Sequence, residues 1–279
     1  MQFSPLCPTP QVHPSLEYLP RLTDRVALFL DFDGTLVDIA PQPELVDVPS
    51  DLVRILSQLS EQLGGALAIV SGRSLHELDL FLAPLVLPVA AEHGAVQRLP
   101  GGLEVHAKPP DLHEISKVAL ALTAQHTQLR VEIKSASVAL HYRQAPELAT
   151  HCLDVLEEAI QHSVGLELLK GKCVFEIKMM GVSKGMAIHT FMTQTPFQGR
   201  PPVFAGDDTT DEAGFIAVKA LGGQGIKVGE GISMADLRCP NPTSLREWLR
   251  GGVAEVKGVE EAEGVKGVEG VEGVRNDAH

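Results

Sequence analysis

The sequence predicts an α/β protein built on a doubly wound parallel sheet, with a separate α+β unit inserted into it. Two observations predict this fold. Short apolar runs of strand length alternate with amphipathic stretches of helix length, which is the pattern of βαβ units. Between residues 101 and 179 this pattern gives way to a mixture of helices and strand-like runs, which indicates a second compact unit.

Four continuous apolar runs are predicted as strands of the sheet, because strands buried on both faces lack the polar alternation of exposed ones. Stretches with a helical spacing of apolar residues separate them. The strands are predicted at 26–30, 66–70, 87–91 and 201–205, and the helices at 51–63, 183–194 and 210–221, with another helical segment between the second and third strands. Polar clusters follow the strands, and ligands of doubly wound sheets bind at that edge.

The inserted unit is predicted to contain two helices and several strands. The helices are expected at 111–125 and 147–161, and the strands at 130–134, 137–143, 166–169 and 173–178. A unit that enters and leaves at one edge of another domain can act as a cap that closes over the strand ends. We expect its hinges near residues 99–102 and 179–182.

The sequence therefore divides into a Rossmann-like core at 23–100 and 180–250 and an α+β cap at 101–179. Residues 1–22 are rich in proline and show no periodicity, so an irregular lead-in is expected there. Residues 251–279 repeat GVE and GVK without proline, which indicates a flexible, solvated tail and not a collagen-like segment.

Charge and cysteine content exclude several classes of partner. The formal net charge of -13 argues against sequence-independent binding to nucleic acid, which needs lysines and arginines at the phosphates. The cysteines form no CxxC pair, so neither a zinc site nor a disulfide framework is expected. The N-terminus lacks the features of a signal peptide, and no apolar run reaches the length of a membrane span. We expect a cytoplasmic monomer that binds neither membrane nor nucleic acid.

Asp31 and Asp33, in the sequence DFDGT, flank one residue at the end of the first predicted strand. A turn after Asp31 can bring both carboxylates to one substrate atom from different directions. A carboxylate that attacks phosphorus forms an aspartyl-phosphate and divides a difficult displacement into two steps. The neighbouring acid can protonate the departing alkoxide and then take a proton from the hydrolytic water. The pair indicates hydrolysis of a phosphate monoester, with Asp31 as nucleophile and Asp33 as acid and base.

A second acidic cluster, GDDTTDE at 206–212, follows the last predicted strand. Its carboxylates would repel one another without a bound cation, and an anionic substrate that approaches an anionic nucleophile also needs one. Magnesium prefers oxygen ligands from one or two carboxylates together with water, so Mg²⁺ is the expected cofactor. Lys184 is expected to balance the charge, and Ser71 with its neighbouring amides to bind the phosphoryl oxygens.

Each of these residues also has a purely structural interpretation. Ser71 could cap a helix, Lys184 could be a solvated surface lysine, and Asp208 or Asp211 could cap the following helix. The ordered set of DxDGT, SGR, a distant lysine and GDDxTDE, each at a predicted sheet edge, favours a phosphoryl-transfer site.

The chain resembles the haloacid dehalogenase-like phosphatases in four motifs, DFDGTL, SGR, SKG and GDDTTDE, which occur in the family's order. The resemblance covers residues 26 to about 249, and the insert is placed as in members with the second cap type. Within that superfamily the chain is similar to the trehalose-6-phosphate phosphatases in AEHGA at 91–95, SVALHYR at 137–143, FEIKMMGVSKG at 175–185 and GDDTTDEAGF at 206–215.

The resemblance implies a set of ligands for the magnesium ion. The carboxylates of Asp31 and Asp207 would hold it, together with the main-chain carbonyl of Asp33. Asp208 and Asp211 would support these ligands.

The same resemblance assigns other motif residues to the phosphoryl end of the substrate. Ser71 and Lys184 would contact the phosphoryl group, and Thr35 would be a positioning residue. Phe32, between the two aspartates, is included among the substrate contacts. Arg73 is either an accessory cation for the substrate or a salt-bridge partner at the sheet edge.

Substrate choice is expected to reside in the cap, because many substrates share the phosphate group and only the sugar distinguishes them. Trehalose is an uncharged, polyhydroxylated disaccharide, so side chains that accept from and donate to hydroxyls should bind it. Glu176 and Lys178 alternate on a predicted strand and can face one side. The further candidates are Arg143, Glu92, His93 and Lys172, of which His93 could instead cap or pack.

The resemblance implies magnesium-dependent hydrolysis of trehalose 6-phosphate to trehalose and phosphate. Sucrose phosphate, mannosyl phosphoglycerate or a simple hexose phosphate is the alternative substrate. A phosphomutase, which shares the DxDGT nucleophile, and a catalytically silent regulator that binds trehalose phosphate are alternatives from other classes. The intact set of Asp31, Asp33, Lys184 and Asp207 argues against the silent regulator. The family usually has a proline soon after EIK, where this chain has Met179 and Met180, and this difference predicts a more flexible hinge.

Overall fold

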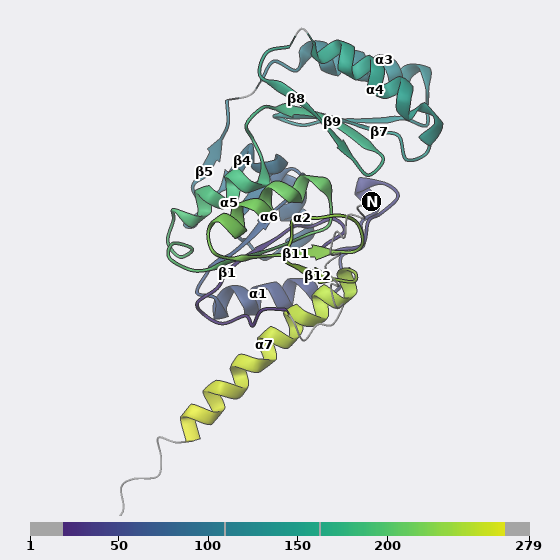
Figure 1. Ribbon diagram of the computed structural model, residues 1–279. Helices are drawn as coiled ribbons and strands as arrows, with labels where there is room; N and C mark the ends of the chain where they lie inside the picture. Colours follow the sequence, from purple (N-terminus) through teal and green to yellow (C-terminus); the bar gives the residue numbers. More distant parts are fainter. Residues whose placement is uncertain (1–18, 109, 162, 266–279) are drawn as a thin grey trace, which may run out of the picture.

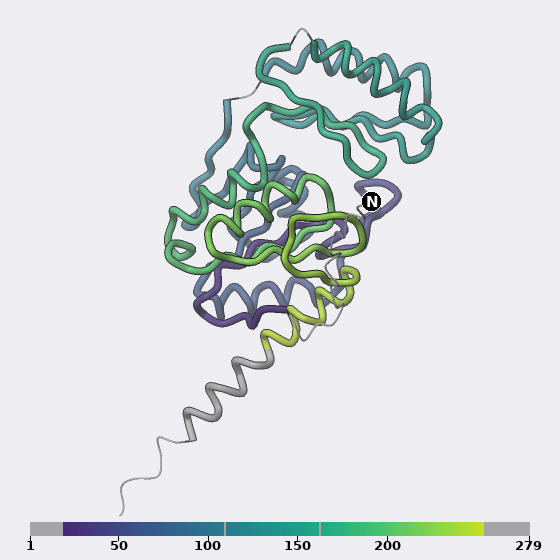
Figure 2. Tube along the Cα trace, in the orientation of Figure 1, coloured from purple at the N-terminus to yellow at the C-terminus, as the bar shows by residue number. Residues whose placement is uncertain are grey.

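The computed structural model describes residues 19–108, 110–161 and 163–265, with side chains as far as residue 253. Figures 1 and 2 show two stacked parts, a larger core and a smaller cap that lies over it. The predicted fold class is confirmed, because the core surrounds a mostly parallel sheet with helices and the cap is a separate α+β unit. Within the described part of the chain, every helix is too short or too polar to cross a membrane.

The core sheet has eight strands in the order β12-β11-β10-β1-β2-β3-β4-β5. The strands from β12 to β3 run parallel, whereas β4 and β5 extend the sheet as antiparallel strands at one edge. The bounds are β1 Ala27–Leu30, β2 Leu67–Val70, β3 Val89–Ala91, β4 Val96–Arg98, β5 Glu104–His106, β10 Pro202–Gly206, β11 Gln224–Val228 and β12 Leu237–Cys239.

Helices lie on both faces of this sheet, with α1 against α7 on one face and α5 against α6 on the other (Figure 1). The bounds are α1 Leu52–Gln62, α2 Leu75–Leu82, α5 Lys184–Met192, α6 Glu212–Ala220 and α7 Pro242–Val265, with the 3-10 turns η2 Pro43–Leu45, η3 Glu92–Gly94 and η5 Thr209–Asp211. All four residues of β1 are fully buried between these layers, as the continuous apolar run predicts.

The register of the central strands brings the motifs to one edge. Leu30 of β1 pairs with Ala205 of β10 on one side and with Ile69 of β2 on the other. The chain therefore leaves all three strands at the same level, and the side chains that follow them can meet there.

The cap has its own sheet and its own apolar core. Its antiparallel strands, in the order β6-β7-β9-β8, are covered on the face away from the core by two helices (Figure 1). Phe175 and Ile177 of β9 pack toward those helices, which leaves Glu176 on the opposite face, above the core. The bounds are α3 His113–Gln125, β6 Arg130–Ile133, β7 Ser137–His141, η4 Pro146–Leu148, α4 Ala149–Ile160, β8 Leu166–Gly171 and β9 Val174–Met179.

The boundary between core and cap differs from the expected one. Strands β4 and β5 form a hairpin within the core sheet, so the chain passes into the cap between His106 and His113. Gly101 and Gly102 turn this hairpin with φ values of 85° and 87°, so 99–102 is a tight turn and not a hinge. Three-residue strands carry too little periodicity to be recognised in the sequence.

The expected irregular ends of the chain are partly ordered. The indole N–H of Trp248 donates to the carbonyl of Pro20 at 3.0 Å, and Leu19 and Leu22 are buried. These contacts fix the last residues of the expected lead-in against α7, whereas residues 1–18 lie outside the described part.

Helix α7 continues to Val265, so residues 251–265 are helical where a flexible tail was expected. No proline interrupts this stretch, and each glycine within a helix costs only about 1 kcal/mol relative to alanine. The rest of the predicted tail, 266–279, lies outside the described residues.

Candidate active site

Asp31 follows β1 directly and is 4% exposed. The hydroxyl of Thr35 donates to its Oδ2 at 3.2 Å. Gly34 has a φ of 75°, and a Cβ at this position would lie 2.3 Å from Oδ2 of Asp207. The DFDGT turn therefore needs glycine both for its conformation and for close approach to the second acidic cluster.

The second acidic cluster is organised around Asp211. Its Oδ2 accepts from the amides of Asp207 at 2.9 Å and Asp208 at 2.8 Å, which folds the chain after β10 into a compact turn. This turn brings oxygens of Asp31, Asp207 and Asp211 within 4.8 Å of one another. All three residues are buried.

Lys184 lies between two of these acids. Its ammonium donates to Oδ1 of Asp31 and to Oδ1 of Asp211, each at 2.7 Å, and the residue is 3% exposed. Burial lowers the pKa of Lys184, but the two carboxylates outweigh that effect and raise it above its ordinary value. Lys184 is therefore a fixed positive charge, and its interpretation as a solvated surface lysine is wrong.

The three carboxylates fit a divalent cation. Burial raises the pKa of Asp31 well above its ordinary value, and the charges of Asp211 and Asp207 add to this effect. Lys184 pairs with Asp31 and Asp211, and the partly exposed Lys172 of the cap pairs with Asp207, so two lysine ammonium groups face three buried carboxylates. Carboxylate oxygens are also the ligands that a hard cation prefers, so the acidic triad could hold a metal ion.

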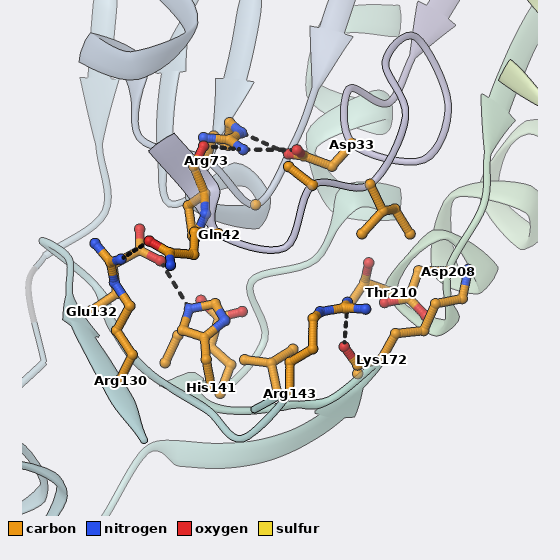
Figure 3. Close-up of a pocket in the computed structure, with 18 of the residues that line it drawn as sticks. Asp33, Gln42, Arg73, Arg130, Glu132, His141, Arg143, Lys172, Asp208 and Thr210 are labelled. Atoms are coloured by element: carbon orange, nitrogen blue, oxygen red, sulfur yellow. Dashed lines mark hydrogen bonds and ion pairs between the residues drawn. The ribbon is translucent and has the colours of Figure 1, made fainter. Parts of the chain in front are cut away.

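Asp33 points to a different partner from Asp31. Its two carboxylate oxygens accept from Nε of Arg73 at 2.7 Å and from Nη2 of Arg73 at 2.8 Å (Figure 3). This bidentate pair is the stronger form of ion pair. The salt-bridge interpretation of Arg73 is therefore correct in this structure. Ser71, which is 1% exposed, accepts from the amide of Arg73 at 3.2 Å.

A cavity of about 470 Å³ lies between the core and the inner face of the cap sheet (Figure 3). The acids at the strand ends form its floor, and polar side chains of the cap form its roof. Of the residues expected in the site, those that line it are Asp31, Asp33, Ser71, Arg73, His93, Arg143, Lys172, Glu176, Lys184, Asp207 and Asp208.

Glu176 is the most strongly bound side chain of the roof. Its Oε1 accepts from the hydroxyl of Ser137 at 2.6 Å and from Lys134 at 3.3 Å, and its Oε2 lies 2.8 Å from Nε2 of His93. The other ring nitrogen of His93, Nδ1, is buried and has no hydrogen-bond partner within the described chain.

Lys172 links the tip of the cap hairpin to the acids. Its ammonium donates to Oδ2 of Asp207 at 2.6 Å, and its carbonyl accepts from Arg143 at 3.1 Å. The cap is thus in contact with the core at the end where the phosphoryl group is expected.

Several expected substrate contacts do not line the cavity. Phe32 is fully buried, and its ring stacks on Phe81 beneath the site. The carboxylate of Glu92 accepts from the hydroxyl of Ser135 and the amide of Ala136, both at 2.9 Å, so it docks the cap turn onto the core.

Lys178 also lies away from the cavity. Its ammonium donates to Glu167 and to the carbonyl of Val182, where the chain leaves the cap. Its alternation with Glu176 is real, but β9 has already passed the cavity at this position. Lys178 therefore fixes the second hinge and does not contact the space for a sugar.

The structure adds cavity residues that the sequence analysis did not identify. Glu132 of β6, Lys134 directly after β6 and His141 of β7 line the roof of the cavity, while Gln42 and Arg130 close one side. Charged residues alternate at 130, 132 and 134, so a period-2 pattern in the strand could have indicated them.

The lowered pKa of Glu176 should make the stability of the folded protein depend on pH. Burial raises its pKa, but Lys134 and His93 outweigh that effect and hold it well below the ordinary value of 4.5. Because the folded-state pKa is the lower one, this stabilisation is complete above about pH 4.5 and is lost as the pH falls through the folded-state value. Glu176→Gln should therefore lower the thermal midpoint at neutral pH, with a deficit that shrinks in acid.

Thermal unfolding over a pH series checks this, with Glu157→Gln as the control, since Glu157 pairs with Lys170 on the exposed surface of the cap. A deficit that is the same at all pH values would contradict the assigned charge of Glu176.

Known proteins are similar to this chain in sequence and in fold. A family model described as trehalose-phosphatase matches residues 29–233. The trehalose-6-phosphate phosphatase of Escherichia coli K12 is 41% identical over 232 residues, which cover 82% of this chain and 87% of that protein. The crystal structure of a trehalose-6-phosphate phosphatase related protein has a TM-score of 0.67 at 30% identity, over 85% of this chain and 99% of that one. A phosphatase of the haloalkanoate (HAD) enzyme superfamily from Bacteroides thetaiotaomicron has a TM-score of 0.54 at 17% identity, over 84% and 97% of the two chains, and supports the fold alone.

Proposed function

The chain belongs to the trehalose-phosphatase family, and we propose that it hydrolyses trehalose 6-phosphate to trehalose and phosphate through an aspartyl-phosphate on Asp31. It is a phosphoric monoester hydrolase. The observation that carries the proposed mechanism is the position of Asp31, which is fixed by Lys184 and Thr35 at the floor of a polar cavity.

In the first step, Oδ2 or Oδ1 of Asp31 attacks phosphorus, and the bond between phosphorus and the sugar oxygen breaks. Lys184 keeps the nucleophile oriented and neutralises charge on the transferring group. Ser71 lies at the neighbouring strand end, where its hydroxyl and the amides of the loop can donate to the phosphoryl oxygens. Asp33 enters this step protonated, gives its proton to the departing sugar oxygen and is left as a carboxylate that Arg73 binds.

In the second step, water attacks the phosphorus of the aspartyl-phosphate. Asp33, now a carboxylate, takes a proton from that water, and Asp31 is released. Two acids with separate environments suit this division of work, because Asp31 is held by Lys184 and Asp33 by Arg73.

Asp31 and Asp207, with the main-chain carbonyl of Asp33, would hold Mg²⁺, and Asp211 would orient Asp207 through its amide. When bound, the ion supplies positive charge that lets an anionic substrate approach the anionic nucleophile. Asp208 would support this cluster from the cavity wall.

The cap suits a polyhydroxylated sugar. Glu132 and Glu176 can accept from hydroxyls, while Lys134, Arg143 and His93 can donate to them. The cavity volume of about 470 Å³ lies within the usual range for sites that bind small organic molecules. Lys172 connects the two ends of the site and can contact both the sugar and the phosphoryl group.

Removal of divalent cations should abolish phosphate release from trehalose 6-phosphate, because the acids would then repel the substrate. Activity should return with added Mg²⁺. Phosphate release measured before and after treatment with EDTA, and again after Mg²⁺ is restored, checks this. A second readout is the thermal midpoint, which Mg²⁺ should raise by relieving the repulsion among Asp31, Asp207 and Asp211. Full activity in EDTA would contradict the role given to the acidic triad.

A further inference from the structure

The contacts of Asp33 extend well beyond the DFDGT turn in which it lies. Arg73 holds Asp33 and is itself 7% exposed. Its Nη1 donates to Oε1 of Glu77 at 3.0 Å, and its guanidinium carbon lies 4.9 Å from the ring centroid of Phe81. Ser74 in turn donates to Glu77 at 2.7 Å, at the start of α2. Arg73 is therefore fixed on one side by the core.

On its other side Arg73 contacts a turn that reaches toward the cap. Its Nη2 donates to the carbonyl of Pro43 at 3.0 Å. Pro43 begins the 3-10 turn η2, which the amide of Leu45 closes by donating to the carbonyl of Gln42 at 3.0 Å. Gln42 and Glu44 flank Pro43 directly, so the carbonyl that Arg73 binds and these two side chains belong to one short turn.

The same turn is bound by the cap. Nη1 of Arg130 donates to Oε1 of Gln42 at 3.3 Å (Figure 3). The guanidinium of Arg130 also forms an ion pair with Glu44. Arg130 is the first residue of β6, so it moves with the cap sheet. A continuous series of contacts thus joins the edge of the cap to Asp33.

We propose that Arg130, the turn η2 and Arg73 form a positioning relay, through which closure of the cap sets the orientation of the carboxylate of Asp33. The inference rests on the proposed function, in which Asp33 transfers the proton. When the cap lifts, Arg130 leaves Gln42 and Glu44, the turn is released, and Arg73 loses the carbonyl of Pro43. The closed cap thus adds the Pro43 contact to the core contacts of Arg73, and so fixes the orientation of Asp33 toward the leaving group.

The effect of the relay on proton transfer can be measured by comparing two substrates that differ only in their leaving group. Phenyl phosphate and 4-nitrophenyl phosphate both form the aspartyl-phosphate on Asp31 with cleavage of the P–O ester bond. Phenol has a pKa of about 10, so phenolate needs the proton of Asp33 as it departs. Nitrophenolate is a much weaker base and leaves without a proton. Neither compound carries a sugar, so contacts to sugar hydroxyls do not enter the comparison.

The quantity to measure is the ratio of kcat/KM for 4-nitrophenyl phosphate to that for phenyl phosphate, with Mg²⁺ and the full chain. Arg73→Lys keeps the charge but cannot hold two carboxylate oxygens and a carbonyl at once. Arg130→Ala removes the contact at the edge of the cap. We expect each variant to raise the ratio about 10-fold, because part of the proton transfer is lost for phenyl phosphate alone.

The double variant tests whether Arg73 and Arg130 act through one coupled series of contacts. If both residues act through one relay, Arg73→Lys with Arg130→Ala should raise the ratio about 10-fold and not about 100-fold. Lys170→Ala is the matched control, since it breaks an exposed ion pair with Glu157 inside the cap and should leave the ratio unchanged.

An unchanged ratio in Arg130→Ala, or a multiplicative effect in the double variant, would overturn the relay. Arg130 is 44% exposed at its side chain, so this variant should fold even if Arg73→Lys does not. Phosphate release from trehalose 6-phosphate by the wild type is measured in the same series. Its absence would remove the proposed function, whereas the ratios report on the relay separately.

Discussion

Asp31→Asn should lower the turnover of trehalose 6-phosphate by at least about 10³-fold, because an amide cannot form the aspartyl-phosphate. The fold should be retained, since Lys184 keeps its contact with Asp211 and one of three mutually repelling carboxylates is removed. Steady-state phosphate release and the thermal midpoint, measured on the same preparation, check both parts.

Asp24→Asn serves as the control, because Asp24 is an exposed aspartate of the core. Substantial residual activity in Asp31→Asn, with the control fully active, would remove Asp31 as the nucleophile.

Lys184→Met should abolish activity and also destabilise the protein by about 3–5 kcal/mol in the absence of divalent cations. The lysine is buried and paired with both Asp31 and Asp211, so its loss leaves two carboxylates without a counter-charge. Added Mg²⁺ should raise the thermal midpoint more in this variant than in the wild type, because the ion then supplies the missing positive charge.

The matched control is Lys219→Met, which removes an exposed pair with Asp236 and should change stability little. If Lys184→Met had the same thermal midpoint as the wild type without metal, the buried ion pairs of Lys184 with Asp31 and Asp211 would be contradicted.

The sequence allowed the positions of the proposed catalytic groups to be predicted, because short buried strands end directly before Asp31, Ser71 and Asp207. Parallel strands in register bring such residues to one edge, so sequence order and strand ends were sufficient. Lys184 could be assigned only by its motif, since a lysine at the start of a helix has no distinctive pattern of its own.

The cap was harder to predict from the sequence. Lys178 was predicted to contact the sugar, but it does not line the cavity. Alternation along a strand predicts which face a side chain is on, but not where along the strand the cavity ends. Contacts such as Arg130 to Gln42 join residues 88 positions apart and depend on how the cap sits on the core, which no local pattern describes. The monomeric state and the cytoplasmic location stay predictions.

The most direct test of the central claim is a comparison of kcat/KM for trehalose 6-phosphate and glucose 6-phosphate with Mg²⁺, and with sucrose phosphate as a second disaccharide. Trehalose 6-phosphate and glucose 6-phosphate share the phosphorylated glucose ring, so only contacts of the cap with the second ring can distinguish them. We predict at least about 100-fold preference for trehalose 6-phosphate, because Glu132, Lys134 and Glu176 can bind hydroxyls of a second ring that glucose 6-phosphate lacks. Equal values for trehalose 6-phosphate and glucose 6-phosphate would contradict it.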